Sequence, residues 1–312
     1  MAGGAPARLR EVPEAALSPL RIWAMAARPR TLPAAVAPVL VGSAAAAEAA
    51  DGFRWGAFVA ALAGSIFIQI GTNLANDYSD ARRGADTEDR LGPVRVTSAG
   101  LVAPRRVLYA TWVAFGIAVA AGVYLATVAG PVILAVGAVS IAAGVLYTGG
   151  PRPYGYAGLG ELFVFLFFGV VAVNGSYYVQ LEELDGLPFG LSVSVGLLAT
   201  AILVVNNVRD IDTDRRAGKR TLAVRLGRDR ARSLYVAMIG AAFAVLPLTL
   251  LLIGGTAWAL LGLASAPLVV RPARAVLTRT DGPALNGALA GTGALLGAFS
   301  VLLAAGLLIA QA

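Results

Sequence analysis

The chain has 312 residues, of which 58% are hydrophobic and only 14% charged, and its mean hydropathy is +0.74. Soluble globular proteins are closer to half apolar and one quarter charged, so this composition indicates a membrane protein and excludes a disordered one. The sequence has no cysteine and no histidine, which excludes disulfides, thiolate nucleophiles, imidazole bases and zinc or haem ligation. Any metal site must use oxygen ligands, which favours a hard cation such as Mg²⁺.

Nine mostly uncharged segments are long enough to cross a bilayer core of about 30 Å as helices. Their continuous runs of Ala, Leu, Gly and Val favour helices over the alternating strands of a barrel. We therefore expect an all-α polytopic membrane protein, with a nine-helix domain over residues 31–312. The tail, 1–30, contains an interfacial helix over residues 14–28 in this interpretation. The predicted spans are 31–49, 55–76, 106–127, 131–148, 158–180, 188–208, 231–253, 256–272 and 286–310.

The basic residues give the expected orientation of these spans. If nine spans are correct, all of the 25 lysines and arginines except Arg54 lie on one side of the membrane. Basic residues are retained on the cytoplasmic side, so the N-terminus is predicted to be cytoplasmic and the C-terminus external. The formal net charge of +7 is explained by this asymmetry, and we expect membrane lipid rather than nucleic acid as a partner.

Acidic residues gather at the cytoplasmic ends of the second and sixth spans. The first cluster is Asn73-Leu-Ala-Asn76-Asp77-Tyr-Ser-Asp80, and the second is Asn206-Asn-Val-Arg-Asp210-Ile-Asp-Thr-Asp214. Spacings of three and four place the amides and carboxylates of each cluster on one helix face. Both clusters are followed by Arg-Arg and Gly, which indicates a weak repeat of four helices whose two half-sites face a central cavity.

Carboxylates that lie close together repel one another unless a cation lies among them. Mg²⁺ binds carboxylate, amide and water oxygens and commonly joins one or two carboxylates to a phosphate. Arginines and lysines that follow the clusters are suited to phosphate oxygens, and these include Arg95, Lys219 and Arg220. The sequence therefore predicts a diphosphate bound through Mg²⁺ at the mouth of an apolar cavity, as for a polyprenyl diphosphate. The alternative for the acids is a solvated helix end with surface ion pairs.

Several ordered motifs resemble the UbiA-type membrane prenyltransferases, and within them most closely the 1,4-dihydroxy-2-naphthoate polyprenyltransferases of menaquinone synthesis. The resemblance covers nearly all of the chain after about residue 20 and is carried by Ala-Ala-Arg28-Pro-Arg-Thr-Leu-Pro33, Gly-Thr-Asn73-Leu-Ala-Asn-Asp77-Tyr, Ala-Asp86-Thr-Glu-Asp-Arg-Leu-Gly-Pro93, Tyr147-Thr-Gly-Gly-Pro-Arg-Pro-Tyr154-Gly-Tyr, Gly158-Leu-Gly-Glu161, and Asn206-Asn-Val-Arg-Asp210-Ile-Asp-Thr-Asp214.

The resemblance implies a UbiA-like bundle of nine helices that binds Mg²⁺ and diphosphate through two aspartate-rich motifs. The metal role is carried to Asn73, Asp77, Asp80, Asp210 and Asp214, and the first motif also matches at Asn76. The four aspartates are then the expected catalytic residues. The broader family often has a further aspartate four residues after the position of Asp80, where this chain has Gly84, and the next acid is Asp86.

The implied reaction is transfer of a polyprenyl group to 1,4-dihydroxy-2-naphthoate at the carbon that bears the carboxyl group, with loss of carbon dioxide, giving demethylmenaquinone. Asn73, Asn76, Arg95, Lys219, Arg220, Tyr147 and Glu161 are the expected substrate-binding residues. The Gly- and Pro-rich stretch from Tyr147 to Tyr156 is interpreted as a rigid turn or lid, or as an ordinary connector. Glu161 is expected to orient the acceptor or to pair with an arginine.

Two alternative functions remain open at this stage. The same fold and metal site would serve another acceptor, such as 4-hydroxybenzoate, homogentisate, haem or a chlorophyllide. A cation-coupled transporter would use the acids as ion sites, although their position at span ends rather than at the midplane favours the enzyme.

Overall fold

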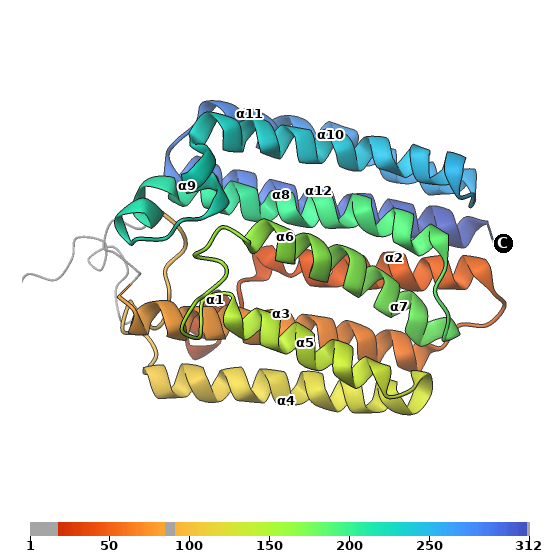
Figure 1. The fold of residues 1–312 in the computed structure, drawn as a ribbon, viewed down its shortest axis with the longest axis horizontal. Helices are drawn as coiled ribbons and strands as arrows, with labels where there is room; N and C mark the ends of the chain where they lie inside the picture. Colours follow the sequence, from red (N-terminus) through yellow and green to blue (C-terminus); the bar gives the residue numbers. More distant parts are fainter. Residues whose placement is uncertain (1–17, 85–90, 311–312) are drawn as a thin grey trace, which may run out of the picture.

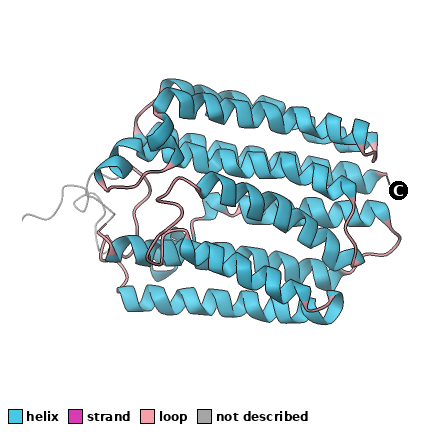
Figure 2. Cartoon of the chain, viewed as in Figure 1, coloured by secondary structure: helices cyan, strands magenta, loops and turns pink. Residues whose placement is uncertain are grey.

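The computed structural model describes residues 18–84 and 91–310, and these residues form helices and loops with no strand (Figure 2). The first half contains α1 (Pro19–Ala27), the 3₁₀ turn η3 (Pro29–Thr31), α2 (Pro33–Ala49), α3 (Trp55–Arg82), α4 (Pro104–Ala129), α5 (Val132–Leu146), and α6 (Gly160–Val164) with the π-helical η4 (Phe165–Val171) and α7 (Ala172–Leu181). The second half contains α8 (Gly186–Arg216), α9 (Leu222–Leu226), α10 (Arg228–Leu252), the 3₁₀ helix η5 (Ala257–Val269), α11 (Val270–Thr278) and α12 (Gly282–Ile309).

The helices that are long and apolar enough to cross a membrane match the predicted spans. Seven such segments occur among the described residues, and an eighth is formed if the helices over Pro19–Thr31 and Pro33–Ala49, which meet at 52°, count as one bent span. The fourth predicted span corresponds to the shorter helix α5. The all-α membrane architecture is therefore confirmed, and the helices are compatible with nine spans. Helix α1 lies within the predicted interfacial segment, although residues 14–17 lie outside the described residues.

Helices α3 and α8 extend past the predicted span ends at residues 76 and 208. Helix α3 continues to Arg82 and α8 to Arg216, so both acidic clusters lie on helical turns. The predicted ends followed the loss of apolar residues, whereas the backbone hydrogen-bond ladder continues through polar turns. Basic residues in the last turn of each helix also favour continuation, because they complement the negative end of the helix dipole.

The long helices run side by side along the longest axis of the molecule, and their connections gather at two opposite ends (Figure 1). Helix α3 packs mainly on α4, α8 packs on α10 and α12, and α2 joins the two groups through α12 and α7. The C-terminal ends of α3 and α8 lie at the same end of the molecule, where α9 and the start of α6 are also found (Figure 1). The two acidic clusters are thus brought to one end of the bundle.

Two glycines allow the helix of the fifth predicted span to approach α8 closely. A Cβ atom on Gly169 would lie 2.7 Å from the Cα atom of Gly196, and one on Gly196 would lie 3.0 Å from the Cα atom of Gly169. No side chain fits between these backbones. Gly169 belongs to the π-helical turn η4, and such turns displace the residues that follow them around the helix axis. This contact fixes η4 against the middle of α8, so that α6 lies beside the acidic end of α8 and α7 runs toward its other end.

Candidate active site

One cavity of about 360 Å³ joins the acidic helix ends to the apolar interior of the bundle. Its polar end is lined by residues of both acidic clusters and of the loops beside them. Further from this end, small and aliphatic side chains of α3, α4 and α5 form its wall, including Ala61, Gly64, Ile68, Ala118, Leu125, Ile133 and Val136. The cavity therefore offers a charged head-group site and an apolar extension within one space.

The side-chain amides of Asn73 and Asn76 connect α3 to neighbouring segments by hydrogen bonds at the polar end of the cavity. The Nδ2 atom of Asn73 donates to the carbonyl oxygen of Ala27 at 3.0 Å and to Oγ1 of Thr31 at 3.2 Å. The Oδ1 atom of Asn76 accepts from Oγ1 of Thr148 at 2.7 Å. Both asparagines line the cavity, as the sequence predicts for substrate-binding residues.

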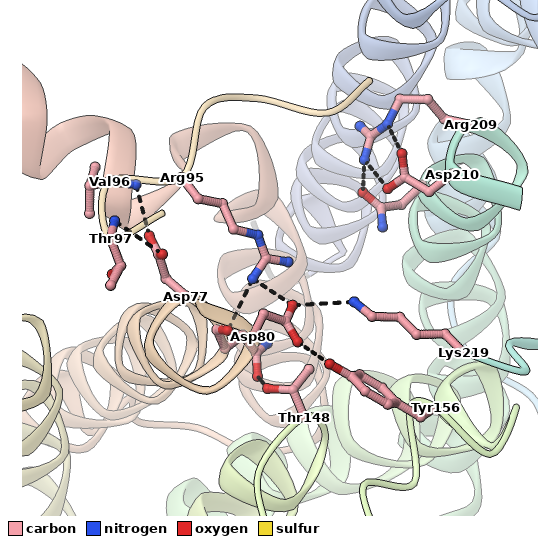
Figure 3. Close-up of polar contacts among 12 residues, drawn as sticks. Asp77, Asp80, Arg95, Val96, Thr97, Thr148, Tyr156, Arg209, Asp210 and Lys219 are labelled. Atoms are coloured by element: carbon pink, nitrogen blue, oxygen red, sulfur yellow. Dashed lines mark hydrogen bonds and ion pairs between the residues drawn. The ribbon is translucent and has the colours of Figure 1, made fainter. Parts of the chain in front are cut away.

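Asp80 is the point at which three loops meet (Figure 3). Its Oδ2 atom lies 2.5 Å from NH1 of Arg95 and 3.5 Å from Nζ of Lys219, and its Oδ1 atom accepts a hydrogen bond from the hydroxyl of Tyr156. The Asp80 side chain is 1% exposed, so these interactions act with little screening by water. Asp80 and both cations line the cavity, as does Tyr156.

Tyr156 also contacts the second acidic helix through its neighbours. The Nζ atom of Lys219 lies 4.7 Å from the centre of the Tyr156 ring, and the backbone N–H of Arg220 donates to the carbonyl oxygen of Tyr156 at 2.9 Å. Burial, followed by the negative charge of Asp80, raises the pKa of the Tyr156 hydroxyl above its usual range. The hydroxyl therefore stays protonated at neutral pH and acts as a hydrogen-bond donor to Asp80.

At the end of α8, Asp210 is paired with the arginine that precedes it. The Nε and NH2 atoms of Arg209 contact the two carboxylate oxygens of Asp210 at 2.8 and 2.6 Å (Figure 3). Arg209 also donates to Oδ1 of Asn206 and to Oδ1 of Asn286, each at 2.7 Å, and its side chain is only 1% exposed. Arg209 is therefore fixed beside the acids of α8, and Asn286 on α12 holds it from the opposite side.

Lys219 joins the two acidic helices. Its backbone N–H donates to the carbonyl oxygen of Asp214 at 2.8 Å, while its side chain reaches Asp80 on α3. Asp214 and Asp210 both line the cavity. The prediction that the two clusters face a common cavity is thus consistent with the structure, and one lysine lies between them.

Asp77 is oriented differently from the other predicted aspartates. Its Oδ2 atom accepts from the backbone N–H of Val96 at 3.1 Å, and its Oδ1 atom accepts from that of Thr97 at 3.3 Å (Figure 3). Asp77 is buried but is not among the residues that line the cavity. A spacing of three residues predicts that Asp77 and Asp80 share one face of α3, but Asp80 lines the cavity whereas Asp77 faces the segment before α4.

Three further predicted residues lie at the borders of the site. Tyr147 lines the cavity, whereas Arg220 is exposed and Glu161 is buried behind the wall. The Oε1 atom of Glu161 accepts from Nδ2 of Asn207 at 2.8 Å, and Asn207 lines the cavity. The side chain of Arg220 is therefore not brought to the other basic residues, and Glu161 contacts the site only through a neighbour. Asp86, Glu88 and Asp89 lie outside the described residues.

The oxygen donors suit a cation that is shared with a substrate. No group of three or more carboxylates within the described part of the chain is close enough to hold a metal ion by itself. Mg²⁺ does not need such a group, because it commonly uses one or two carboxylates together with water and substrate phosphates. Asp80, Asp210 and Asp214, with the amide oxygen of Asn76, supply such a donor set from two sides of the cavity.

Aromatic side chains that sequence reasoning did not assign to the site form part of its wall. The rings of Tyr154 and Phe163 stack with their centres 4.0 Å apart, and Phe163 stacks on Phe167 at 6.1 Å. All three line the cavity next to Tyr147. The Gly- and Pro-rich stretch was a signal for Tyr154 and Tyr156, whereas the two phenylalanines could not be separated from the other apolar residues of their span.

Arg28 is a further residue that the sequence analysis did not assign to the site. It lies at the corner between α1 and α2, where its φ angle of 53° is in the left-handed region, and it lines the cavity. A non-glycine residue in this conformation is uncommon and costs about 1 kcal/mol or more. The position of Arg28 depends on the 52° bend, which the sequence pattern did not predict.

Comparison with known proteins identifies the family. Residues 35–289 match the model of the UbiA prenyltransferase family. The chain belongs to the UbiA prenyltransferase family. It is 47% identical to the 1,4-dihydroxy-2-naphthoate octaprenyltransferase of Mycobacterium tuberculosis over 271 residues. These residues cover 87% of this chain and 91% of that protein. The Escherichia coli protein with the same name is 38% identical, with coverage of 91% and 94%.

Solved UbiA structures have the same fold. A UbiA homologue from Aeropyrum pernix is similar with a TM-score of 0.67 at 16% identity, and the match covers 89% of this chain and 98% of the homologue. A UbiA homologue from Archaeoglobus fulgidus bound to GPP and Mg²⁺ gives a TM-score of 0.60 at 13% identity, with coverage of 90% and 99%. The resemblance to UbiA proteins expected from the motifs is confirmed.

In this UbiA protein the Arg209–Asp210 pair is predicted to stabilise the fold. Replacing Arg209 with glutamine leaves the buried Asp210 carboxylate without its two charged contacts, which should lower the free energy of unfolding by about 3 kcal/mol. Thermal unfolding of the purified protein in detergent, without added metal, measures this change. Arg54→Gln is the matched control, because the Arg54–Glu182 pair has the same 2.8 Å contact but is 43% and 49% exposed. That variant should change stability by less than about 1 kcal/mol, and equal losses would contradict the assignment.

Proposed function

We propose that the chain is a Mg²⁺-dependent enzyme that transfers a polyprenyl group from a polyprenyl diphosphate to 1,4-dihydroxy-2-naphthoate. The observation that carries this proposal is the meeting of two acid-bearing helix ends at the mouth of a cavity that continues into an apolar interior. The choice of acceptor is supported by relatives from two organisms that carry this acceptor in their names. Binding of GPP and Mg²⁺ by an Archaeoglobus fulgidus UbiA homologue supports the donor and the metal.

The diphosphate is assigned to the polar end of the cavity. Asp80, Asp210 and Asp214, with Asn73 and Asn76, would hold the metal, and Arg95 and Lys219 would contact phosphate oxygens. When bound, Mg²⁺ neutralises charge that develops on the leaving diphosphate. Arg95 and Lys219 already contact Asp80, so these two cations and one of the metal-binding acids are held in one network before the substrate binds.

The aromatic wall is assigned to the reacting carbon. The allylic carbon–oxygen bond of the donor breaks next to the polar end, where Tyr147, Tyr154 and Phe163 line the cavity. Ring faces attract cations, so these side chains would stabilise the developing allylic cation without supplying a nucleophile that captures it. The aliphatic wall beyond them would hold the prenyl chain and exclude water from the cation.

The bonds of the proposed reaction balance without an added oxidant. A carbon–carbon bond forms between the allylic carbon and the ring carbon that bears the carboxylate, and the carbon–oxygen bond to diphosphate breaks. The bond to the carboxylate then breaks, and its electron pair restores the aromatic ring as carbon dioxide leaves. The product is the reduced form of demethylmenaquinone. Glu161 is assigned to acceptor orientation through Asn207, which lies between it and the cavity.

The acidic end of the bundle is assigned to the cytoplasmic side. Exposed arginines at this end include Arg82, Arg83, Arg105, Arg106, Arg215, Arg216, Arg220 and Arg225, whereas Arg54 lies near the opposite end. This distribution supports a cytoplasmic N-terminus and an external C-terminus. Water-soluble parts of the reaction, namely the naphthoate, Mg²⁺ and diphosphate, would then enter and leave from the cytoplasm.

The reaction is tested by offering the purified protein one prenyl donor and several acceptors. With a labelled polyprenyl diphosphate and Mg²⁺, prenylated product should form from 1,4-dihydroxy-2-naphthoate and stop when EDTA removes the metal. 4-Hydroxybenzoate and homogentisate should give no product above background. Faster prenylation of either would replace the proposed acceptor, and no product with any acceptor together with cation flux in vesicles would favour the transporter.

Aspartates on α8 provide a matched comparison for the metal site. Asp210→Asn and Asp214→Asn should each lower kcat/KM by about 100-fold or more, because each removes a negative charge from the cavity. Asp212→Asn on the same helix should change it less than about twofold, since Asp212 is 59% exposed and pairs with Arg228 outside the cavity. Similar activities for all three variants in the prenyl transfer assay would contradict the assignment.

The orientation is tested with single introduced cysteines, because the chain has no cysteine of its own that would react. Asp51→Cys, in the exposed loop between α2 and α3, should react with a membrane-impermeant thiol reagent in intact cells. Arg230→Cys, exposed near the start of α10 at the acidic end, should react only after the membrane is made permeable. The reverse pattern of labelling would invert the proposed topology.

A further inference from the structure

We propose that Asp77 is a positioning residue that holds Arg95 beside Asp80, rather than a ligand of the metal. This inference rests on the proposed function, because it assigns separate roles to two acids of one motif. In the motif Asn76-Asp77-Tyr-Ser-Asp80, only Asn76 and Asp80 line the cavity.

The Asp77 carboxylate is directed at the backbone of the segment that precedes α4 (Figure 3). Val96 and Thr97 donate their backbone N–H groups to its two different oxygens, at 3.1 and 3.3 Å. Adjacent amides that point at one carboxylate define the local backbone conformation, and a charged acceptor makes both hydrogen bonds stronger. Asp77 is 2% exposed, so water does not offer these amides an equivalent partner.

The segment held by Asp77 is a compact turn. The N–H of Ala99 donates to the carbonyl oxygen of Arg95 at 3.0 Å, and the N–H of Val102 donates to that of Val96 at 3.1 Å. The Val96 side chain is fully buried and packs in a small apolar cluster with Leu74 on α3 and Ala26 on α1. Asp77 therefore fixes this turn to α3 at its first residues.

Arg95 comes directly before the two residues whose backbone N–H groups donate hydrogen bonds to Asp77. Its NH1 atom contacts Oδ2 of Asp80 at 2.5 Å and donates to the carbonyl oxygen of Asn76 at 3.0 Å. A guanidinium on a five-bond side chain reaches one chosen point only if its own backbone is fixed. The Asp77–amide contacts provide this fixation, so Asp77 acts on the diphosphate site through Arg95 without entering the cavity.

A first test measures the rate of amide hydrogen exchange in the turn, in the absence of metal and substrate. In hydrogen–deuterium exchange of the purified, metal-free protein, Asp77→Ala should speed exchange of a peptide that covers residues 95–102 by at least about tenfold, because two buried amides lose their acceptor. Asp80→Asn, which removes the charge three residues away, should leave the exchange of this peptide within about twofold. Unchanged exchange in Asp77→Ala, or equal effects of the two variants, would overturn the proposal.

A second test is a double-mutant cycle on kcat/KM for the polyprenyl diphosphate. Asp77→Ala and Arg95→Gln should each lower it by roughly 10- to 100-fold, mainly through KM, as expected for the loss of a charged hydrogen bond. The double variant should be within about threefold of Arg95→Gln, because Asp77 acts through that arginine. The Mg²⁺ concentration for half-maximal activity should stay within about twofold in Asp77→Ala.

Multiplicative losses in the double variant, together with a higher Mg²⁺ requirement in Asp77→Ala, would make Asp77 a ligand and overturn the inference. If Asp77→Ala does not fold, Asp77→Asn replaces it, since it keeps one acceptor oxygen and should show the same pattern with smaller changes. Failure of the proposed function is distinguishable, because the wild-type protein would then be inactive while the exchange experiment would still report the contact between Asp77 and the turn.

Discussion

The arrangement of the polar end depends on one buried carboxylate, that of Asp80. Arg95, Tyr156 and Lys219 reach it from three loops that are far apart in the sequence. A buried carboxylate that loses its partners costs several kcal/mol, so the side chains of these three residues are held against Asp80. The same residue that would bind the metal thus also organises the cations around it.

Contacts of this kind also explain how the ligand-free bundle can keep the acids of both clusters in a protein interior. Three buried acids of the two clusters have a cation or backbone donors beside them: Arg95 and Lys219 for Asp80, Arg209 for Asp210, and the amides of Val96 and Thr97 for Asp77. The negative charges of Asp80 and Asp210 are therefore offset by neighbouring cations before any metal binds. A metal–diphosphate complex would enter a network that already contains groups of both signs, so binding exchanges partners rather than burying new charge.

The helices and the acidic clusters were predictable because hydrophobic segment length and four-residue spacing are local properties. The convergence of the clusters followed from the count of spans, since both end even-numbered helices. The separate orientation of Asp77 was not predictable, because it depends on where the turn after residue 95 folds against α3. For the same reason, Arg220 and Lys219 are adjacent in sequence, yet only Lys219 reaches the cavity. The helix ends at Arg82 and Arg216 also differed from the prediction, because the apolar content of a segment does not show where its helical backbone hydrogen bonds end.

The short length of α5 has a consequence for the surrounding lipid. With 15 residues it extends for about 22 Å, which is less than a hydrocarbon core of about 30 Å. Such hydrophobic mismatch is relieved when the bilayer thins locally, at a cost of fractions of a kcal/mol for each ångström. Several residues of α5, including Ile133, Val136 and Gly137, line the cavity on their inner side. The thinnest part of the annulus of lipid is therefore expected beside the wall that separates the membrane from the prenyl chain.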